Sequence, residues 1–228
     1  MEQTGAVPPK RTSAKAEPTA PDLAPSLNTA VHDAVRSNDQ WDNERIADAD
    51  FSTADAKDMH VTGCALTNVL LTGAQLERAT LTDVLVTDCE LSGASLAKAA
   101  LRRVVFRNCR MSGIVLSETT LRDVCITTCK LDGANFRFST AEHLVFEDSS
   151  LREGDFAGSA WKKVAFDRCD LQQADFSQAS LENVNLAGSA VDGLRGASTM
   201  RGVTIGSAQA LPFALSMFNE LGITVDDA

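Results

Sequence analysis

Cysteine is the residue type in this sequence best able to do chemistry, and the spacing of the six cysteines is regular. Cys89, Cys109 and Cys129 lie twenty residues apart, and Cys169 lies two further steps of twenty along the chain. If the chain repeats its conformation every twenty residues, these thiols stack closely enough to form disulfides or to bind a soft metal. The alternative is that each thiol fills a small inward position, because free cysteine is commonly buried as a small hydrophobe and the sequence has no Cys-x-x-Cys pair. We expect the filling role, with no metal and no cofactor, and we expect Cys125, which lies outside this set, to face outward.

The remaining residues give no catalytic pattern. His32, His60 and His143 lie far apart in the sequence, and none has metal-ligand spacing or stands beside a candidate nucleophile. The sequence also lacks a Gly-rich phosphate loop and a Gly-x-Ser-x-Gly elbow. We therefore predict that the protein has no catalytic residues and is not an enzyme.

A five-residue period organises the chain. An apolar residue occupies every fifth position from Ile46 to Val191, in thirty positions out of thirty. With 44% of the chain hydrophobic, chance gives this with a probability on the order of 10⁻¹¹. The period fits neither a helix nor a strand, so the chain must turn every five residues.

Two further patterns define the shape of this repeat. A second set of smaller residues precedes each apolar residue by two positions, from Cys64 to Val184. Between the two sets lie polar and turn-forming residues such as Gly, Asn and Asp, which suit tight corners. The small residues sort into columns at intervals of twenty, so four sides make one coil. We predict an all-β solenoid whose coils stack at about 4.8 Å.

The repeat units resemble those of the pentapeptide-repeat proteins. Their consensus, Ala-Asp/Asn-Leu-x-x, is clearest in Ala134–Phe138, Ala174–Gln178 and Val184–Gly188. The resemblance covers about two-thirds of the chain and implies a right-handed quadrilateral β-helix of pentapeptide repeats over residues 46–195.

The N-terminal flank has a different composition. Residues 1–25 hold five of the six prolines and almost no large apolar residues, so we expect a disordered tail. They offer no apolar run for a signal peptide, and no apolar run elsewhere is long enough for a membrane span, which indicates a cytoplasmic protein. Apolar residues at helical spacing between Leu27 and Val35 predict an N-terminal helical cap over residues 26–45, with Trp41 over the first coil. A partner-binding helix is the alternative.

The C-terminal flank, residues 196–228, predicts a strand at 201–205 and a helix from Ser207 to Gly222. One apolar face of this helix can cap the last coil, and the other would remain exposed, which is typical of an interface. The segment is similar to the C-terminal helix module of Qnr- and MfpA-type pentapeptide-repeat proteins, which pair tail to tail. This resemblance implies a homodimer, with a simple C-terminal cap as the alternative. The predicted dimer interface is Phe213, Leu215, Met217, Phe218 and Leu221.

Charge along the chain is banded, within a formal net charge of −10. Residues 48–90 hold eight acids and two bases, a net charge of −6. Residues 98–137 hold eight bases and three acids, a net of +5, and residues 142–182 hold nine acids and four bases, a net of −5. Stacking at intervals of twenty places Glu147 beside Asp167 and Asp155 beside Asp175.

The resemblance gives the second acidic band a function. Qnr- and MfpA-type members are rods whose acidic faces imitate DNA in the DNA-binding saddle of type II topoisomerases such as DNA gyrase, which they inhibit or protect from poisons. By this resemblance the partner is a type II topoisomerase, and the partner-binding residues are Glu147, Asp148, Asp155, Asp167, Asp170 and Asp175. Direct binding of nucleic acid is disfavoured, because exposed aromatic residues for base stacking are scarce.

A rigid interaction scaffold for an unidentified protein is the alternative function. The basic band departs from DNA-like charge, and it could bind an acidic partner. The residues that would do so are Arg102, Arg103, Arg107 and Arg110.

Overall fold

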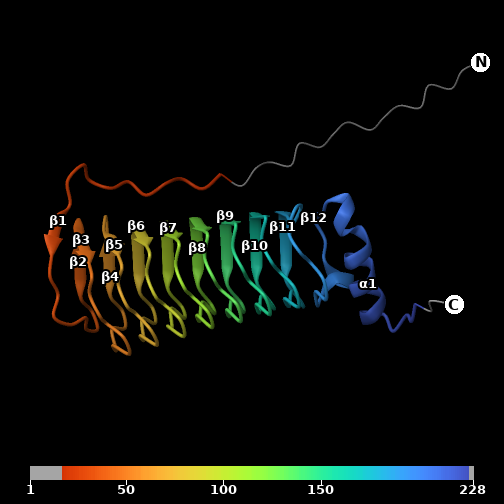
Figure 1. Cartoon of the computed structure of the whole chain (residues 1–228), viewed down its shortest axis with the longest axis horizontal. Coiled ribbons are helices and arrows are strands. Elements are labelled where there is room, and N and C mark those ends of the chain that lie inside the picture. Colours follow the sequence, from red (N-terminus) through yellow and green to blue (C-terminus); the bar gives the residue numbers. More distant parts are fainter. Residues whose placement is uncertain (1–16, 226–228) are drawn as a thin grey trace, which may run out of the picture.

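Short parallel strands stack along one axis in the computed structural model, which describes residues 17–225 (Figure 1). Partner residues in successive coils are twenty apart, as in the pairing of Val84 with Val104 and of Val104 with Val124. The right-handed quadrilateral β-helix expected from the sequence is confirmed. The strands are β1 (Asn28–Ala30), β2 (Gln40–Asp42), β3 (Glu44–Ala47), β4 (His60–Thr62), β5 (Ala65–Thr67), β6 (Thr80–Thr87), β7 (Ala100–Arg107), β8 (Thr120–Thr127), β9 (Thr140–Glu147), β10 (Ala160–Asp167), β11 (Ser180–Asn185) and β12 (Val203–Thr204).

Corners of the coil fall at the second residue after each large inward residue. The backbone there is left-handed whether the residue is glycine, as at Gly93 (φ 67°), or not, as at Asp88 (φ 55°) and Arg168 (φ 53°). This conformation is unfavourable for residues other than glycine. The stacked coils hold it because the corner N–H groups donate to carbonyl groups of the next coil, as Asp88 N does to Arg107 O at 3.0 Å.

Both inward sets of side chains lie in the core, as the period predicts. Among the large residues only Leu81 is more than 9% exposed. The core changes character along the axis, from Leu and Val near β4 to stacked aromatic rings further on. Phe146 and Phe166 are parallel, with centroids 4.8 Å apart, and Phe156 and Phe176 stack at 4.6 Å.

The N-terminal helical cap predicted over residues 26–45 is wrong, because this segment adds strands to the solenoid. β1 pairs with β3, and β2 pairs with β4. Trp41 is 3% exposed and stacks on His32 at 4.6 Å, so it covers the first coil as expected. The edge of the first coil presents unpaired backbone groups that short strands satisfy, whereas a helix of this length is marginal without a packing surface.

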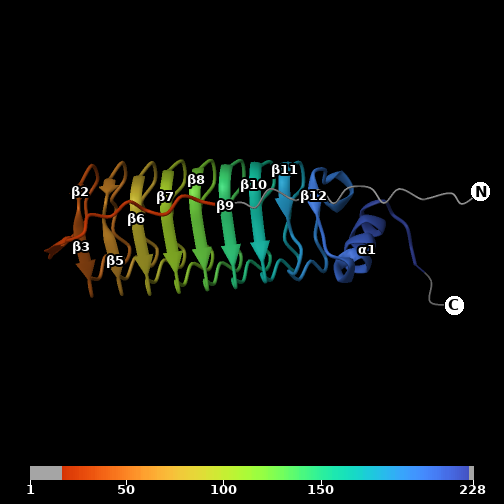
Figure 2. The same ribbon diagram turned by 90° about the horizontal axis from the view of Figure 1, so that it is seen from above.

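The structure describes only the second part of the segment, residues 1–25, that was predicted to be disordered. Residues 1–16 lie outside the described residues. Residues 17–25 are extended and run along the outside of the solenoid across successive strands (Figures 1 and 2), with hydrogen bonds to its corners. For this second part the prediction of disorder is wrong.

Short elements close the other end: η1 (Ala197–Thr199), β12, η2 (Ser207–Gln209) and α1 (Ala210–Glu220). The five-residue period stops at Gly196, where φ is 84° and an added Cβ would lie 2.5 Å from the backbone carbon of Phe176. No side chain fits at that position. The α-helix begins three residues after the predicted start at Ser207, which instead begins η2. None of the helices within residues 17–225 has the length and apolar character that crossing a membrane requires.

Two polar side chains attach this cap to the solenoid. The carboxamide of Gln209 donates to the carbonyl oxygens of Leu186 and Ser189, both at 2.6 Å. The carboxylate of Glu220 accepts the backbone N–H groups of Ala197 and Ser198, both at 2.9 Å. These bonds satisfy backbone groups that the last coil would otherwise leave unpaired.

Candidate functional site

The six predicted acidic residues do not share one face of the solenoid. Glu147 is the last residue of strand β9 and Asp148 follows it; both lie beside Asp167 at the end of β10, since Glu147 and Asp167 are register partners. Asp155 and Asp175 are also partners, one coil apart, but they lie two sides of the coil further on. Asp170 lies on the side between them, stacked on Ser150 and Ala190. The structure therefore brings together one group of three carboxylates and one pair.

Arg168 lies at the centre of the group of three. Its guanidinium donates to Glu147 Oε1 at 2.6 Å, to Asp148 Oδ1 at 2.7 Å and to Asp167 Oδ2 at 2.6 Å. The hydrogen bonds with Arg168 lower the pKa of Asp148, and those with Asp148 and Glu147 raise the pKa of Arg168. Three carboxylates surround one guanidinium, so the group has a formal local net charge of −2.

The other three predicted acidic residues accept hydrogen bonds from the backbone at the corners. Oδ1 of Asp155, Asp170 and Asp175 accepts the N–H of the residue two positions later, at 2.8 to 3.0 Å. This is the Asx-turn geometry that a corner needs. Each also pairs with one arginine, at distances of 2.9 to 3.4 Å. Burial opposes the ionisation of Asp175, but the hydroxyl and N–H of Ser177 outweigh it and hold the pKa of Asp175 below its usual value.

The arginines of the basic band form fewer ion pairs with carboxylates than the arginines beside the predicted acidic residues. Arg102, Arg107 and Arg110 are exposed, and within residues 17–225 none has a carboxylate oxygen within 4.0 Å. Arg103 differs, because its guanidinium binds Asp83 in a two-point contact. The structure also places Arg102 beside Arg122 in neighbouring strands. This band therefore presents unpaired positive charge to solvent.

All six cysteines are free, and the five at inward positions are buried, as predicted. The Cys109 N–H donates to the Cys129 sulfur at 3.3 Å, which is the stacking expected from the spacing of twenty. Burial raises the pKa of the Cys169 thiol to about 11, so it stays protonated and unreactive. Cys125 is half-buried rather than fully outward. Within residues 17–225 no cluster of His, Cys, Asp or Glu could hold a metal ion.

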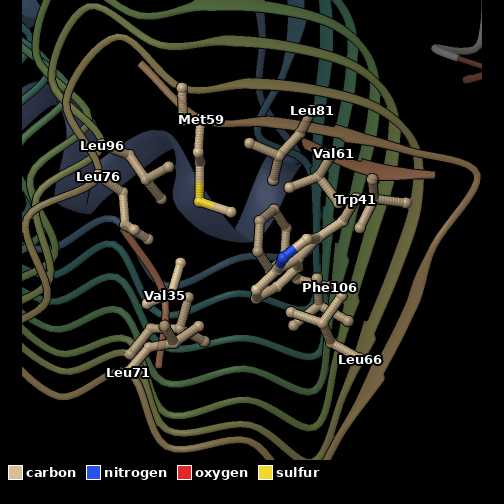
Figure 3. A pocket seen from close by; sticks show the side chains of 14 residues that line it. Val35, Trp41, Met59, Val61, Leu66, Leu71, Leu76, Leu81, Leu96 and Phe106 are labelled. Carbon is tan, nitrogen blue, oxygen red and sulfur yellow. The ribbon is translucent and has the colours of Figure 1, made fainter. Parts of the chain in front are cut away.

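A cavity in the core lies near the N-terminal end, among side chains of the first coils (Figure 3). Its volume is about 40 Å³, and its lining includes Val35, Trp41, Met59, Leu81 and Phe106. Sites for small molecules usually measure about 300–1,000 Å³ and carry a few polar groups. This cavity is therefore a packing defect of an apolar stretch of core, and it does not form a ligand site.

The C-terminal helix has one face on the cap and one face open. Phe213 packs against the core, and Met217 is half-buried. Leu215, Phe218 and Leu221 are 39%, 36% and 61% exposed. Three of the five predicted interface residues therefore lie on the open face. The open apolar surface also includes residues that the predicted interface lacked: Leu211, Ile223 and Val225.

Sequence models of known families match most of the solenoid. The model described as "Pentapeptide repeat region" matches residues 79–156 and 122–196, and that described as "Pentapeptide repeats (8 copies)" matches residues 47–85. The chain belongs to the pentapeptide-repeat family. No curated protein matches this pentapeptide-repeat protein.

Solved structures of the same family resemble it at low identity. A trypsin-treated variant of QnrB1, a plasmid-mediated fluoroquinolone resistance protein, is 21% identical, with 88% of this chain and 98% of that chain covered and a TM-score of 0.38. HetL from Nostoc sp. strain PCC 7120, involved in heterocyst differentiation regulation, is 19% identical, with 78% and 84% covered and a TM-score of 0.34. These are similarities of fold only.

Proposed function

We propose that this pentapeptide-repeat protein is a non-enzymatic, protein-binding rod whose acidic C-terminal half binds the DNA-binding groove of a type II topoisomerase such as DNA gyrase. The supporting observation is the charge of the last coils. Residues 138–196 hold ten acids and five bases, a net charge of −5. The group around Arg168 concentrates three of these carboxylates at the ends of β9 and β10. Basic residues that bind DNA phosphates are the natural partners of such a surface.

Rigidity of the rod favours this mode of binding. The carboxylates of Glu147 and Asp167 belong to paired strands, so their spacing is that of successive coils, about 4.8 Å. Backbone bonds such as that from Ala157 N to Asp155 orient the remaining acids before any partner arrives. A preorganised surface loses little conformational entropy on binding.

Dimerisation through the open face of α1 belongs to the same proposal. Residues Leu215, Phe218 and Leu221 would meet their counterparts in a second copy, as the isologous contact of a two-fold dimer requires. Because α1 belongs to the cap that follows the acidic coils, a tail-to-tail dimer would place the two acidic halves end to end. This would double the length of the negatively charged surface.

A supercoiling assay with DNA gyrase, with and without a fluoroquinolone, tests the proposal. The wild-type chain should inhibit supercoiling or reduce drug-stabilised cleavage, and the double variant Asp155→Lys with Asp175→Lys should lose this effect. The matched control is Asp50→Lys with Glu90→Lys, which makes the same charge change on the N-terminal coils and should act as wild type. Thermal unfolding of each variant shows that the fold is intact. An equal effect of wild type and the first variant would exclude these carboxylates.

The basic band supports a second candidate function, a scaffold for an acidic protein. The specific observation is that Arg102, Arg107 and Arg110 are exposed and have no carboxylate partner within residues 17–225, whereas each predicted acid has an arginine. Replacing these three arginines by Glu should abolish capture of the partner and leave any gyrase effect unchanged. Loss of the gyrase effect in this triple variant would instead assign topoisomerase binding to the basic band.

A further inference from the structure

The segment from Glu17 to Leu27 runs along the outside of the solenoid and is bound at two points (Figure 2). The backbone N–H of Asp22 donates to Asp83 Oδ1 at 2.9 Å. The backbone N–H of Thr19 donates to Asp123 Oδ1 at 3.2 Å, and the hydroxyl of Thr19 donates to the same oxygen at 3.4 Å. At both points a backbone N–H of the segment donates to a side-chain carboxylate of the solenoid. Hydrogen bonds to the backbone are one way in which proteins bind peptides.

The distance between the two acceptors on the solenoid matches the distance between the two donors of the segment, if the segment is a polyproline II helix. Asp83 and Asp123 occupy the same corner two coils apart, a separation of about 9.6 Å at about 4.8 Å per coil. Thr19 and Asp22 are three residues apart, and one turn of polyproline II is three residues with a rise of about 9.3 Å. Each donor directly follows one of the two prolines of a Pro-x-x-Pro sequence, Pro18 and Pro21.

Burial along the segment has the same period of three. Every third residue is half-buried, whereas Glu17, Thr19, Ala20 and Asp22 are exposed; Leu23 is half-buried in addition to the residues of this period. One face of a helix with three residues per turn therefore lies against the solenoid. The half-buried positions of this period are Pro18, Pro21, Ala24 and Leu27.

The solenoid offers both polar acceptors and an apolar surface at this place. Arg103 binds Asp83 by two points, and His143 Nδ1 lies 3.3 Å from Asp123 Oδ1, so each carboxylate is oriented by a neighbour in the same corner column. Lys163 Nζ lies 3.1 Å from His143 Nε2, so the ring accepts there and donates from Nδ1 to Asp123. The residues two positions after these corners form an apolar stripe on the outer surface of the solenoid. They point outward but are half-buried: Leu85, Val105 and Cys125.

We propose that this corner column and the adjoining stripe form a binding surface for peptides in the polyproline II conformation, which the chain's own Pro18–Leu27 segment occupies in cis. A peptide of another protein with prolines three residues apart would bind the same surface by displacing this segment. The surface lies on β6 to β8 and is separate from the acidic residues near β9 and β10. The proposal therefore does not depend on topoisomerase binding.

Fluorescence anisotropy with a labelled peptide of residues 17–27 tests this inference. The receptor is the full chain with its own segment loosened by Pro18→Gly, Pro21→Gly and Leu23→Gly, changes that raise the entropy of the unbound segment. The peptide should bind the loosened chain at least tenfold more tightly than wild type, in which the tethered segment competes at an effective concentration of about millimolar. Asp123→Ala in the loosened chain should weaken binding about tenfold. The control Asp88→Ala, at the next corner, should have no effect.

Amide hydrogen exchange of the wild-type chain gives an independent readout. The amides of Thr19 and Asp22 should exchange more slowly than in the free peptide, and Asp123→Ala should expose Thr19 more than Asp22. Failure of the peptide to bind the loosened chain, or equal effects of Asp123→Ala and Asp88→Ala, would overturn the proposal. Exchange of both amides at the rates of the free peptide would overturn it as well.

Discussion

Replacing Val84 by Ile should stabilise the protein, because Val84 lines the cavity in the N-terminal part of the core. The cavity measures about 40 Å³, and Val84 is completely buried. At about 24 cal/mol per Å³ of cavity, the empty space costs about 1 kcal/mol. One added methylene group gains about 0.8 kcal/mol when buried. We therefore expect Val84→Ile to raise the free energy of unfolding by about 0.8 kcal/mol and the melting temperature by about 2–3 °C.

Val164 is the matched control, because it occupies the same column of the core four coils further on. It is 1% exposed, and the core at that level is filled by aromatic rings such as Trp161 and Phe166, which stack with centroids 6.2 Å apart. An added methylene group has no space there, so Val164→Ile should cost about 1–3 kcal/mol. Urea unfolding followed by circular dichroism measures both variants. A shift of both midpoints in the same direction would refute the assignment of the cavity to the N-terminal coils.

Changes in the C-terminal cap should have separate effects. Gln209→Ala leaves two buried carbonyl groups of the last coil without a donor, so it should lower the free energy of unfolding by about 2–4 kcal/mol. It should also speed amide exchange in β11. Unchanged exchange would show that water replaces the carboxamide. The pKa of Glu220 lies below its usual value, because hydrogen bonds from η1 outweigh the effect of burial; attachment of α1 should therefore be fully present above about pH 4.5 and weaken as pH falls through the lowered pKa. Glu220→Gln should remove this pH dependence, measured by exchange of the α1 amides. Leu215→Asp with Phe218→Asp should shift the mass in light scattering from dimer to monomer, and a wild-type mass of one chain at all concentrations would contradict the proposed pairing.

Placement of the charged residues shows how far the sequence could predict the candidate site. The repeat of twenty correctly predicted that Glu147 stacks on Asp167 and Asp155 on Asp175. It did not predict that Arg168 reaches three carboxylates, because long side chains choose among several neighbours only when the coils are assembled. Nor did it predict that Asp155 accepts a backbone N–H at its own corner.

By itself the sequence determined the solenoid, its register and both inward sets of side chains. The reason is that each five-residue unit has the same local task, so one period encodes the turn, the core and the stacking together. Tertiary structure decided what lies outside that period. The segment from Asn28 to Asp42 became strands because the first coil offered a free edge, and residues 17–25 lie on the corner column because its carboxylates match the spacing of an extended, proline-containing chain. Contacts between segments about sixty to one hundred residues apart leave no periodic mark in the sequence, so only the assembled coils show them.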